Sequence, residues 1–441
     1  MMKKLWQTTA AQASALMAKG ELGSEEYTAA YLARIAEREP LVQAWAHVDA
    51  ALALEQARRC DRESRRSPLH GIPIGFKDVI RSKDQPTQHG SPLYAGFQPN
   101  EDAHCMAALR AAGAVMLGKT QTLEFACGGQ HPPTRNPRDL QRTPGGSSSG
   151  SGAAVADGMA PLTLGTQTGG SLIRPASFCG VYAMKPTFGR VCFDGVKPYS
   201  PHLDTLGWYG RSVADLALLA ELFRLTDAAQ SVLPEGVPLG AQVGPLHIGQ
   251  LRIAICETPM WAEAEPQAQQ ALTDAVRKLA QAGARVEPLV LPEAFAPING
   301  WQDEIMQDGG RSAFLYESLA MTEGLHADFK AKLNNHLGLT PARMRQALDA
   351  VALRRMEFEA LSEGYDAVLT LSAPGVAPLG LQSQGLATFN RIWTALHVPA
   401  INLPGASGEQ GLPIGLQLIG RRYEDGELLR VAATLARVLD A

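Results

Sequence analysis

Residues 145–186 decide the fold of this chain, and they read GGSSSGSGAAVADGMAPLTLGTQTGGSLIRPASFCGVYAMKP. The stretch contains two Gly-Gly-Ser turns, which end at Ser147 and Ser171, with a helix-like AAVADGM and a strand-like PLTLGTQ between them. Paired glycines let the backbone bend sharply and approach another group closely. A serine in such a turn can act as a nucleophile, and free backbone N–H groups there can hold an oxyanion.

A flexible linker is the alternative interpretation of the first part of this stretch. The segment GGSSSGSG alone has the composition of a mobile Gly/Ser connection. The apolar runs that follow it, however, have the lengths of packed helices and strands. The whole stretch therefore predicts the folded wall of an active site.

The composition is that of a large globular protein. The chain has 441 residues, of which 45% are hydrophobic and 19% charged, enough for one large α/β enzyme domain. Its net charge of −4, with no long basic run, gives no reason to expect nucleic acid or an anionic membrane as a partner. Six scattered cysteines without a Cys-x-x-Cys pair predict reduced core residues, with neither a disulfide framework nor a zinc site.

The N-terminal segment contains two lysines and an alanine-rich run, so a signal peptide has to be considered. Polar residues at 7–9 and at Gln12 interrupt this run. An amphipathic helix that begins near Thr8 or Thr9 and ends at Gly20 fits the pattern better. No apolar run reaches the roughly 18 residues that a membrane span needs. We therefore expect a cytoplasmic protein.

Strand-like and helix-like segments alternate along the chain, which predicts an α/β fold with a sheet covered by helices on both faces. We expect a single domain, 1–441, with four parts: a mostly helical opening (1–66), a catalytic core (67–232), a second α/β and helical part (250–362) and a C-terminal return to the sheet (363–441). Ser24 is the expected N-cap of a helix, and the Pro- and Gly-rich residues 233–249 are the expected linker. The expected strands are 72–76, 253–256, 286–291, 367–371, 400–403 and 414–419. The expected helices are 213–225 and 267–281, with further helix over 300–362 and a loop over 202–209.

Lys77 follows the expected strand 72–76 and has two interpretations. A lysine at the end of a strand is usually a solvated charge. Gly71, Pro73 and Gly75 indicate a tightly packed backbone, which would bury the amine. Burial and a hydrogen bond to a serine would favour the neutral amine that a general base requires.

Two segments match known sequence motifs, but the elements expected around them are not those that the motifs require. Residues 113–120, GAVMLGKT, fit the phosphate-binding pattern GxxxxGK[ST], but that loop follows a strand, whereas here the apolar AVML is itself the strand. Residues 146–150, GSSSG, fit the nucleophile elbow centred on Ser148, but a polar, loop-like segment precedes them in place of a strand. We therefore expect neither a nucleotide site nor an α/β-hydrolase.

The chain resembles the amidase signature family, serine hydrolases with a Ser-Ser-Lys triad. The serines that close the two turns, Ser147 and Ser171, have the spacing that the family shows. The family's lysine lies in a G-I-P-h-x-h-K-D segment, which here is GIPIGFKD, residues 71–78, and contains Lys77. Further matches are LGKT (117–120), TRNP (134–137) and PIGLQ (413–417), so the resemblance covers nearly the whole chain.

The resemblance implies catalysis without a metal or a cofactor. Neutral Lys77 would draw a proton through the bridging Ser147 from Ser171, whose oxygen attacks the amide carbonyl. The bridging serine would follow a cis peptide bond. The ten histidines show no ligand spacing and no partner pattern, which disfavours a metal site and a Ser-His-Asp triad. The implied oxyanion hole consists of the backbone N–H groups of Thr168, Gly169, Gly170 and Ser171.

The identity of the substrate depends on Arg174. The chain reads GTQTGGSLIRPA, so this arginine stands one place later than in many family members, and Gln167 replaces a commonly acidic residue. The variant is similar to malonamidase-type members, in which the arginine holds the substrate carboxylate, and an arginine fork suits a carboxylate. Arg174 could instead be a structural ion-pair residue, and both interpretations stay open.

The resemblance implies an amidase that hydrolyses a small-molecule carboxamide to a carboxylate and ammonia or an amine. The alternatives are a general aryl or aliphatic amidase and the A subunit of a tRNA-dependent glutamine amidotransferase, which delivers ammonia to a partner subunit. The departures at Gln167 and Arg174 count against the amidotransferase. A non-catalytic binding protein on the same fold is disfavoured because all three triad positions are intact. Homodimers are frequent among relatives, so a homodimer is expected.

Overall fold

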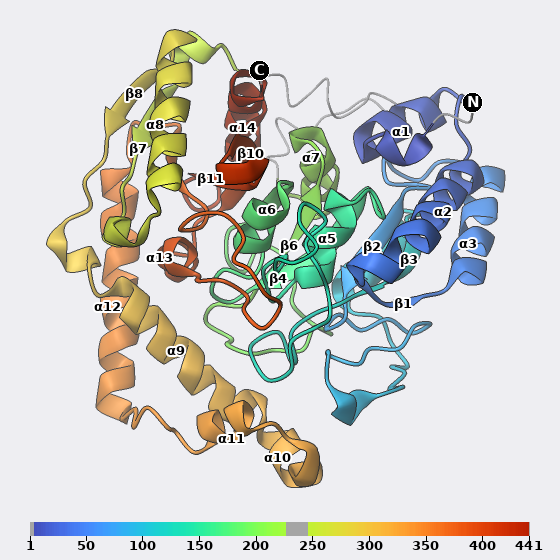
Figure 1. Cartoon of the computed structure of the whole chain (residues 1–441), viewed down its shortest axis with the longest axis horizontal. Coiled ribbons are helices and arrows are strands. Elements are labelled where there is room, and N and C mark those ends of the chain that lie inside the picture. The colour runs from blue at the N-terminus through green and yellow to red at the C-terminus, as the bar shows by residue number, and fades with distance from the viewer. Residues whose placement is uncertain (1–3, 226–245, 441) are drawn as a thin grey trace.

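The structure is a computed structural model that describes residues 4–225 and 246–440 (Figure 1). Most of the expected linker 233–249 therefore lies outside the described residues. Within the described part, one mixed sheet of eleven strands crosses the molecule in the order β1-β3-β2-β4-β6-β5-β10-β11-β9-β7-β8. Helices pack on both faces of this sheet, which confirms the predicted α/β class.

The sheet has two parallel regions joined by an antiparallel one. In the first region β2 pairs in parallel with β3 and β4, and in the second β7 pairs in parallel with β8 and β9. The strands from β4 through β6, β5, β10 and β11 to β9 pair antiparallel. The strands are β1 (Trp45–Val48), β2 (Pro73–Lys77), β3 (Val115–Thr120), β4 (Leu162–Gln167), β5 (Tyr182–Lys185), β6 (Thr205–Gly210), β7 (Arg252–Ile255), β8 (Arg285–Pro288), β9 (Ala367–Leu371), β10 (Ala400–Ser407) and β11 (Pro413–Ile419).

The two faces of the sheet belong to different core clusters because side chains alternate along each strand. In β9, Leu369 and Leu371 enter the largest cluster, while Val368 enters the cluster on the opposite face. The helices of the first face include α1 (Ala10–Ala18), α4 (His104–Ala111), α7 (Val213–Leu222), α8 (Pro266–Gln281) and α14 (Asp425–Leu439). Those of the second include α3 (Ala50–Arg62), α5 (Ser149–Ala156), α6 (Ile173–Cys179) and α13 (Thr388–Ala395).

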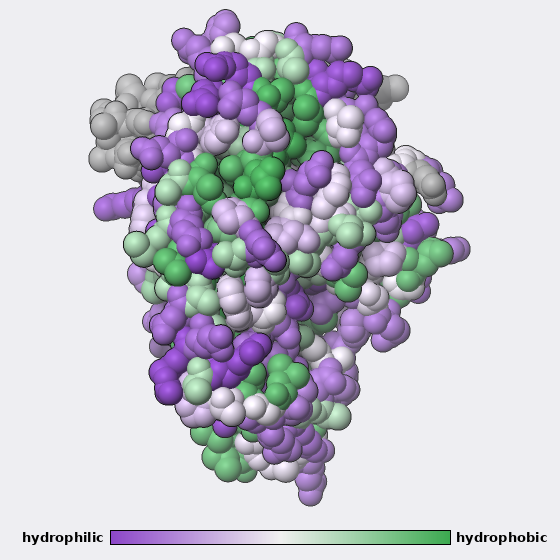
Figure 2. Space-filling view, turned by 90° about the vertical axis from the view of Figure 1, so that its left-hand side faces the viewer, coloured by the Kyte–Doolittle hydropathy of each residue, from purple (hydrophilic) through white to green (hydrophobic). Residues whose placement is uncertain are grey.

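The expected helical region 300–362 forms an arm beside the sheet. It consists of α9 (Ile298–Ala313), α10 (Leu315–Ala320), α11 (Ala327–Leu333) and α12 (Pro341–Leu361). Figure 1 shows α9 beside the sheet, with α10 and α11 at its far end. The side chains and backbone of α9 contact the loop that follows β4, through Gln302 and Thr168, and the loop that precedes β6, through Ile305 and Ser200. On the side that carries α8 and α12, hydrophilic side chains predominate, with hydrophobic side chains gathered in the upper half (Figure 2). None of the described helices is long and apolar enough to cross a bilayer.

Two strands lie where the sequence predicted other structure. The expected loop 202–209 contains β6, and the mostly helical opening contains the edge strand β1. The sequence TLGWYG of β6 contains Gly207, and a glycine inside an apolar run is usually interpreted as a sign of a loop or a weak strand. A Cβ atom at Gly207 would lie 2.3 Å from the carbonyl oxygen of Met184 on β5. The glycine is therefore required by close strand approach, which only the fold reveals.

The ends of three elements also differ from expectation. Helix α2 (Ser24–Val42) begins at Ser24 and has Gly23 as its N-cap, because Asp61 accepts the backbone N–H groups of Ser24 and Glu25. Helix α7 ends at Leu222 in place of 225, and β8 ends at Pro288 in place of 291. The predicted cap at Thr9 is confirmed, since its hydroxyl accepts the backbone N–H of Gln12.

Candidate active site

The two Gly-Gly-Ser turns meet at the carboxyl ends of β2 and β4. These strands run parallel, so the residues that follow them emerge at the same edge of the sheet. Lys77 is the last residue of β2, and the second turn follows β4 directly. The backbone N–H of Ser148 donates to the carbonyl oxygen of Ser171 at 3.4 Å, which joins the two turns.

The amine of Lys77 is fully buried beside the first turn. Its Nζ atom lies 2.7 Å from Oγ of Ser147 and 2.8 Å from Oγ1 of Thr166. No carboxylate of the described residues forms an ion pair with it. Burial holds the pKa of Lys77 well below its usual 10.5, although the negative charge of Asp204 acts in the opposite direction. The buried amine is therefore suited to accept a proton from Ser147.

The first turn contains the cis peptide bond that the resemblance implies, between Gly146 and Ser147. The Ser147 side chain is fully buried, and its carbonyl oxygen accepts the backbone N–H of Leu123 at 3.3 Å. Its neighbour Ser148 has a different role. The Ser148 hydroxyl donates to the carbonyl oxygen of Thr166 and accepts the N–H of the same residue, both at 3.2 Å, so it ties the turn to β4.

Ser171 is 8% exposed as a residue. Its hydroxyl has no hydrogen-bond partner among the described residues, and no hydrogen bond joins it to Ser147. The structure thus brings Lys77 and Ser147 into direct contact and places Ser171 in the adjoining turn. The Ser171 hydroxyl is free to approach a ligand.

The backbone of the second turn is held through its carbonyl oxygens. Each of the four oxygens from residue 168 to 171 accepts a hydrogen bond. Their donors are Nε2 of Gln302 (2.8 Å), Oγ1 of Thr394 (2.8 Å), the N–H of Arg174 (3.0 Å) and the hydroxyl of Tyr209 (3.2 Å), in that order.

The N–H groups of the same turn are unoccupied. Across residues 4–225 and 246–440, no acceptor lies on the backbone N–H of Thr168, Gly169, Gly170 or Ser171. A loop whose carbonyl oxygens are bound and whose N–H groups are free presents preorganised donors to an anion. Gly170 has no room for a side chain, because its Cβ atom would lie 2.5 Å from Oδ1 of Asn390.

Asp204 is a buried carboxylate that sequence reasoning missed. Its oxygens accept the hydroxyl of Thr168 at 2.5 Å and the backbone N–H groups of Tyr199 and Ser200 at 2.7 and 2.9 Å. Burial raises its pKa to about 6. Thr166, Tyr209, Gln302 and Thr394 were missed as well. No local pattern marks these residues, because they reach the turns only across the fold.

Gln167 replaces the commonly acidic residue and still serves as an acceptor. Its Oε1 atom accepts the backbone N–H groups of Leu172 and Ile173 at 3.0 and 3.1 Å, at the start of α6. Its Nε2 atom donates to Oγ1 of Thr394 at 3.0 Å. A neutral amide thus satisfies the helix start, and its second group links the turn to α13.

Arg174 is buried, with 3% of the residue exposed. Its guanidinium donates to the carbonyl oxygen of Gly146, to that of Gly385 at 2.7 Å and to Oε1 of Gln384 at 2.7 Å. Among the described residues it has no ion-pair partner, so the ion-pair form of the structural interpretation is wrong. Burial lowers its pKa to about 9. The bonds connect the first turn to residues 384–385 and favour a structural role.

The rim of the site combines uncharged and charged groups. Around Gly169, the nearest side-chain atoms to an added Cβ would be Nε2 of Gln302, Sδ of Met306 and Cβ of Ala387, at 3.9–4.0 Å. Next to this wall, Asp303 and Arg391 form an ion pair at 3.4 Å, and each is about one-third exposed. The rim therefore offers one cation and one anion to an entering ligand.

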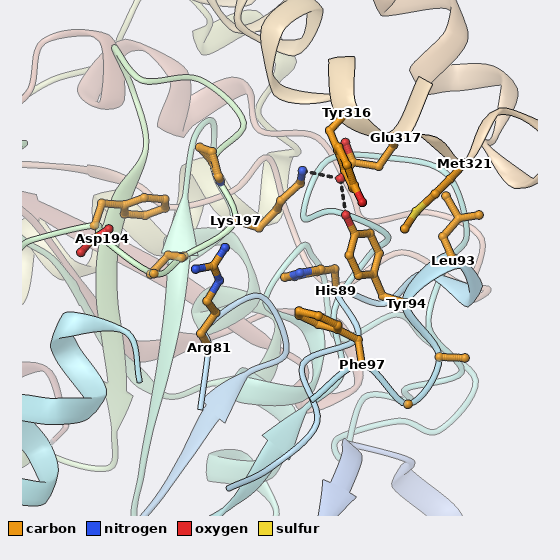
Figure 3. A pocket seen from close by; sticks show the side chains of 16 residues that line it. Arg81, His89, Leu93, Tyr94, Phe97, Asp194, Lys197, Tyr316, Glu317 and Met321 are labelled. Atoms are coloured by element: carbon orange, nitrogen blue, oxygen red, sulfur yellow. Dashed lines mark hydrogen bonds and ion pairs between the residues drawn. The ribbon is translucent and has the colours of Figure 1, made fainter. Parts of the chain in front are cut away.

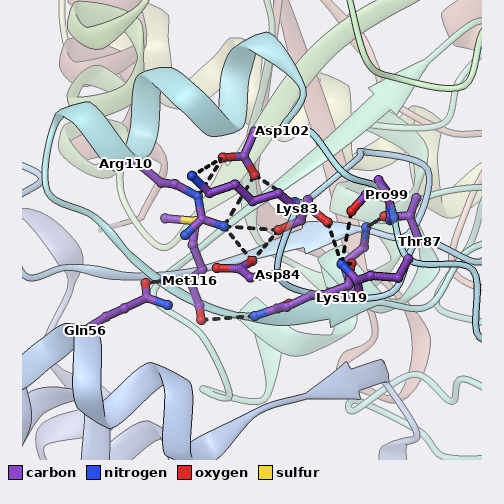
Figure 4. A network of polar contacts seen from close by, with 12 residues as sticks. Gln56, Lys83, Asp84, Thr87, Pro99, Asp102, Arg110, Met116 and Lys119 are labelled. Atoms are coloured by element: carbon purple, nitrogen blue, oxygen red, sulfur yellow. Dashed lines mark hydrogen bonds and ion pairs between the residues drawn. The ribbon is translucent and has the colours of Figure 1, made fainter.

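The rejected phosphate-loop motif is a buried strand. Residues 115–120 form β3, and all six are buried. The Lys119 amine donates to the carbonyl oxygen of Ile80 and to Oγ1 of Thr87, and it pairs with Asp78 at 3.5 Å (Figure 4). This lysine is a structural part of the core. The described residues contain no cluster of His, Cys, Asp and Glu suited to a metal ion.

Comparison with known proteins places these features in a family. The family model described as Amidase matches residues 26–429. The chain belongs to the amidase family. Its triad-like cluster therefore lies in an enzyme that acts on carbon–nitrogen amide bonds, and the resemblance seen in the sequence is confirmed.

Individual relatives cover nearly the whole chain. The A subunit of the glutamyl-tRNA(Gln) amidotransferase of Chloroflexus aggregans is 35% identical and covers 100% of this chain and 98% of its own. That of Moorella thermoacetica is also 35% identical, over 97% of this chain and 96% of its own. Among solved structures, an amidase has a TM-score of 0.85 at 28% identity, covering 97% of this chain and 99% of its own. The peptide amidase of Stenotrophomonas maltophilia has a TM-score of 0.80 at 29% identity, covering 98% and 96%.

Proposed function

We propose that this chain hydrolyses a carboxamide through an acyl-enzyme on Ser171, with Ser147 and Lys77 as its proton relay. The observation that carries the proposal is the contact between a fully buried, unpaired Lys77 amine and Ser147, beside a turn whose N–H groups are all free. Burial without an ion pair favours the neutral amine, and the free N–H groups suit a developing oxyanion.

The chemistry then runs in two halves. Lys77 takes the Ser147 proton as Ser147 takes that of Ser171, and the Ser171 oxygen bonds to the amide carbon. The tetrahedral oxygen is held by the N–H groups of Thr168, Gly169, Gly170 and Ser171. Ser147 returns a proton to the leaving nitrogen as the carbon–nitrogen bond breaks. Water, deprotonated by the same relay, releases the carboxylate and restores Ser171.

Two further groups suit an amide ligand. Oε1 of Gln302 and Oδ1 of Asn390 are buried acceptors without a donor within the described residues. Both side chains lie against the second turn, since Gln302 bonds Thr168 and Asn390 packs on Gly170. A buried acceptor without a donor is costly, and a carboxamide or ammonia would supply N–H donors.

Substitution of the relay tests the proposal. We expect Ser171→Ala and Lys77→Ala each to remove most ammonia release, and the double variant to lose little more, because the residues act as one unit. Ser148→Ala is the matched control for the loss of a buried hydroxyl in the same turn, since the Ser148 hydroxyl bonds Thr166 of β4 and takes no part in the relay. The proposal fails if Ser171→Ala retains near wild-type turnover while Ser148→Ala shows that the assay and the fold are intact.

The named relatives favour the A subunit of a tRNA-dependent glutamine amidotransferase as the function of this chain. They support this function better than that of a free-standing small-molecule amidase. Two sequence departures had counted against it. Gln167 satisfies the start of α6 and Arg174 binds backbone oxygens, so both departures have structural explanations that leave the substrate open. The charged rim pair of Asp303 and Arg391 suits an amide that carries both charges, as glutamine does.

Ammonia release from glutamine, malonamate and neutral aliphatic and aryl amides of similar size separates these uses. Preference for glutamine, together with a second protein that co-purifies with the chain at its native level of expression, supports the amidotransferase. Preference for malonamate that disappears in Arg174→Ala supports a carboxylate-amide hydrolase anchored by Arg174. Preference for neutral or aryl amides supports a general amidase. A homodimer is proposed on the resemblance alone, and the cytoplasmic location stays a prediction.

A further inference from the structure

The structure contains a cavity of about 850 Å³. Residues 89–97, residues 193–198 and the region of α10 form its walls (Figure 3). Gln302, Met306 and Ala387, which surround the Ser171 turn, do not line it. The cavity is therefore distinct from the candidate active site.

Packed aromatic rings separate the two places. Phe125, Phe314 and Tyr199 belong to one buried cluster. Phe125 lies 6.2 Å from His89, which lines the cavity, and 5.5 Å from Phe314, measured between ring centroids. The Tyr199 ring lies tilted against that of Phe314, at 5.8 Å between centroids. The backbone N–H of Tyr199 donates to Asp204, which accepts the hydroxyl of Thr168 in the turn.

Two buried polar side chains of the cavity have atoms without hydrogen-bond partners among the described residues. Glu317 is fully buried, and its Oε1 atom accepts Nζ of Lys197 at 2.6 Å and the Tyr94 hydroxyl at 2.7 Å. Its Oε2 atom has no donor among the described residues. The His89 ring, in a residue only 5% exposed, has no hydrogen-bond partner there either. Buried polar groups in proteins are usually satisfied, so the His89 ring indicates a missing partner, whereas Oε2 of Glu317 requires a donor that an anion does not supply.

Positive charge gathers at this point. Figure 3 shows the side chains of Arg81, His89 and Lys197 pointing into the same space, and the carboxylate of Asp194 turned away from it. Burial, with the charges of Lys119, Lys197 and Arg81 behind it, holds the pKa of His89 well below 6.5. The imidazole is therefore neutral and can donate one N–H.

Arg81 is the cation of the cavity with free hydrogen-bond donors. Lys197 is already neutralised by Glu317 at the floor of the cavity. The Arg81 guanidinium forms one ion pair, with Glu101 at 2.9 Å, and its side chain is 45% exposed. Four of its five N–H groups are therefore available, which is enough for a two-point contact with a carboxylate.

The walls beside these groups are aromatic and apolar. Phe97 is 41% exposed, although large apolar side chains are usually covered. Its ring meets that of Tyr94 edge-on, at 5.6 Å between centroids. Leu93 and Met321 complete the apolar side, next to Tyr94 (Figure 3). A flat apolar body would cover these surfaces.

Side-chain hydrogen bonds and ion pairs stabilise residues 82–102, part of which lines the cavity. Arg110 binds Asp84 at 2.6 Å and Asp102 at 2.9 Å, and the Gln98 amide donates to three backbone carbonyl oxygens of the same segment (Figure 4). Preorganised groups lose less conformational freedom when a ligand binds. The cavity is therefore ready to bind without rearrangement of its base.

We propose that this cavity binds a small organic anion with a flat apolar body, such as an aromatic carboxylate. The carboxylate pairs with Arg81 and accepts the N–H of His89, while the ring packs against Phe97 and Tyr94. The site extends the function beyond amide hydrolysis, since it needs neither Ser171 nor the proton relay.

Calorimetric titration with benzoate tests the proposal on the full-length protein. We expect saturable binding to wild type and a loss of affinity of about tenfold or more in Arg81→Gln, because a charged two-point contact is removed. Phe97→Ala weakens binding as well, and benzamide binds at least several-fold more weakly than benzoate. Lys83→Gln is the matched control, because this lysine is 57% exposed on the same segment and lies outside the cavity.

Ser171→Ala distinguishes this site from the candidate active site, and its benzoate affinity is expected to equal that of wild type. Urea unfolding of Arg81→Gln verifies that the surface substitution leaves the fold intact. The proposal is overturned if benzoate does not bind wild type in the millimolar range, or if Arg81→Gln and Lys83→Gln bind it equally. It is also overturned if Ser171→Ala loses the binding.

Discussion

Replacing Arg174 by alanine separates the two interpretations of this residue. The change removes the donor from three acceptors, the carbonyl oxygens of Gly146 and Gly385 and the side-chain oxygen of Gln384. At about 1–3 kcal/mol for each buried acceptor left unsatisfied, the loss is roughly 3–9 kcal/mol. Relief from burying a guanidinium, several kcal/mol, offsets part of it. We expect a net loss of about 3 kcal/mol in the free energy of unfolding.

The structural role also predicts a specific kinetic pattern. Because Arg174 connects the Ser147 turn to residues 384–385, its loss should lower kcat for all substrates by a similar factor. Urea unfolding and ammonia release from malonamate and from a neutral amide of the same size measure the two effects. Arg277→Ala is the control, since this arginine lies on α8 outside the candidate site and its exposed ion pair with Asp274 contributes at most about 1 kcal/mol.

The opposite result would refute this reasoning. If Arg174→Ala unfolds at the wild-type urea concentration and loses activity on malonamate alone, its hydrogen bonds to Gly146 and Gly385 are dispensable. Arg174 would then be the carboxylate anchor, as in the malonamidase-type interpretation. Equal losses on both substrates with reduced stability would exclude that role.

Two further substitutions examine the relay and the turn. Lys77→Met should abolish ammonia release yet raise stability. Burial depresses the Lys77 pKa, so between the folded pKa and 10.5 the folded protein binds fewer protons than the unfolded chain, and wild type loses stability as the pH falls through that range. The gain in the free energy of unfolding over wild type should be largest below the folded pKa and shrink toward pH 10.5. Urea unfolding at pH 7 and at pH 10 measures this gain, and an equal gain at both would contradict a depressed pKa. Thr394→Val keeps the shape but removes the bond to the Gly169 carbonyl oxygen and the acceptor of the Gln167 amide. We expect stability to fall by about 2 kcal/mol and kcat by about tenfold, and an unchanged kcat would count against a positioning role of these two bonds.

The sequence predicted much of the fold because local chemistry and periodicity agree there. The strands near 72–76, 367–371 and 414–419 are short apolar runs, and each is a strand of the sheet. The rejection of the phosphate-loop motif needed only the order of strand and helix around residues 113–120, and β3 confirms it. The prediction of a loop at β6 was wrong, since the glycine of this strand serves contact with β5.

Local sequence was enough to specify the family and to single out Lys77, Ser147 and Ser171 as the predicted triad, because the turns and the lysine segment carry their own signatures. Packing across the fold set which groups surround them. Tyr209, Gln302 and Thr394 bind the carbonyl oxygens of the turn from distant parts of the chain, and no local pattern encodes such contacts. The contacts of Arg174 arise in the same way, because the hydrogen-bond partners of a buried guanidinium depend on which segments the fold brings next to it.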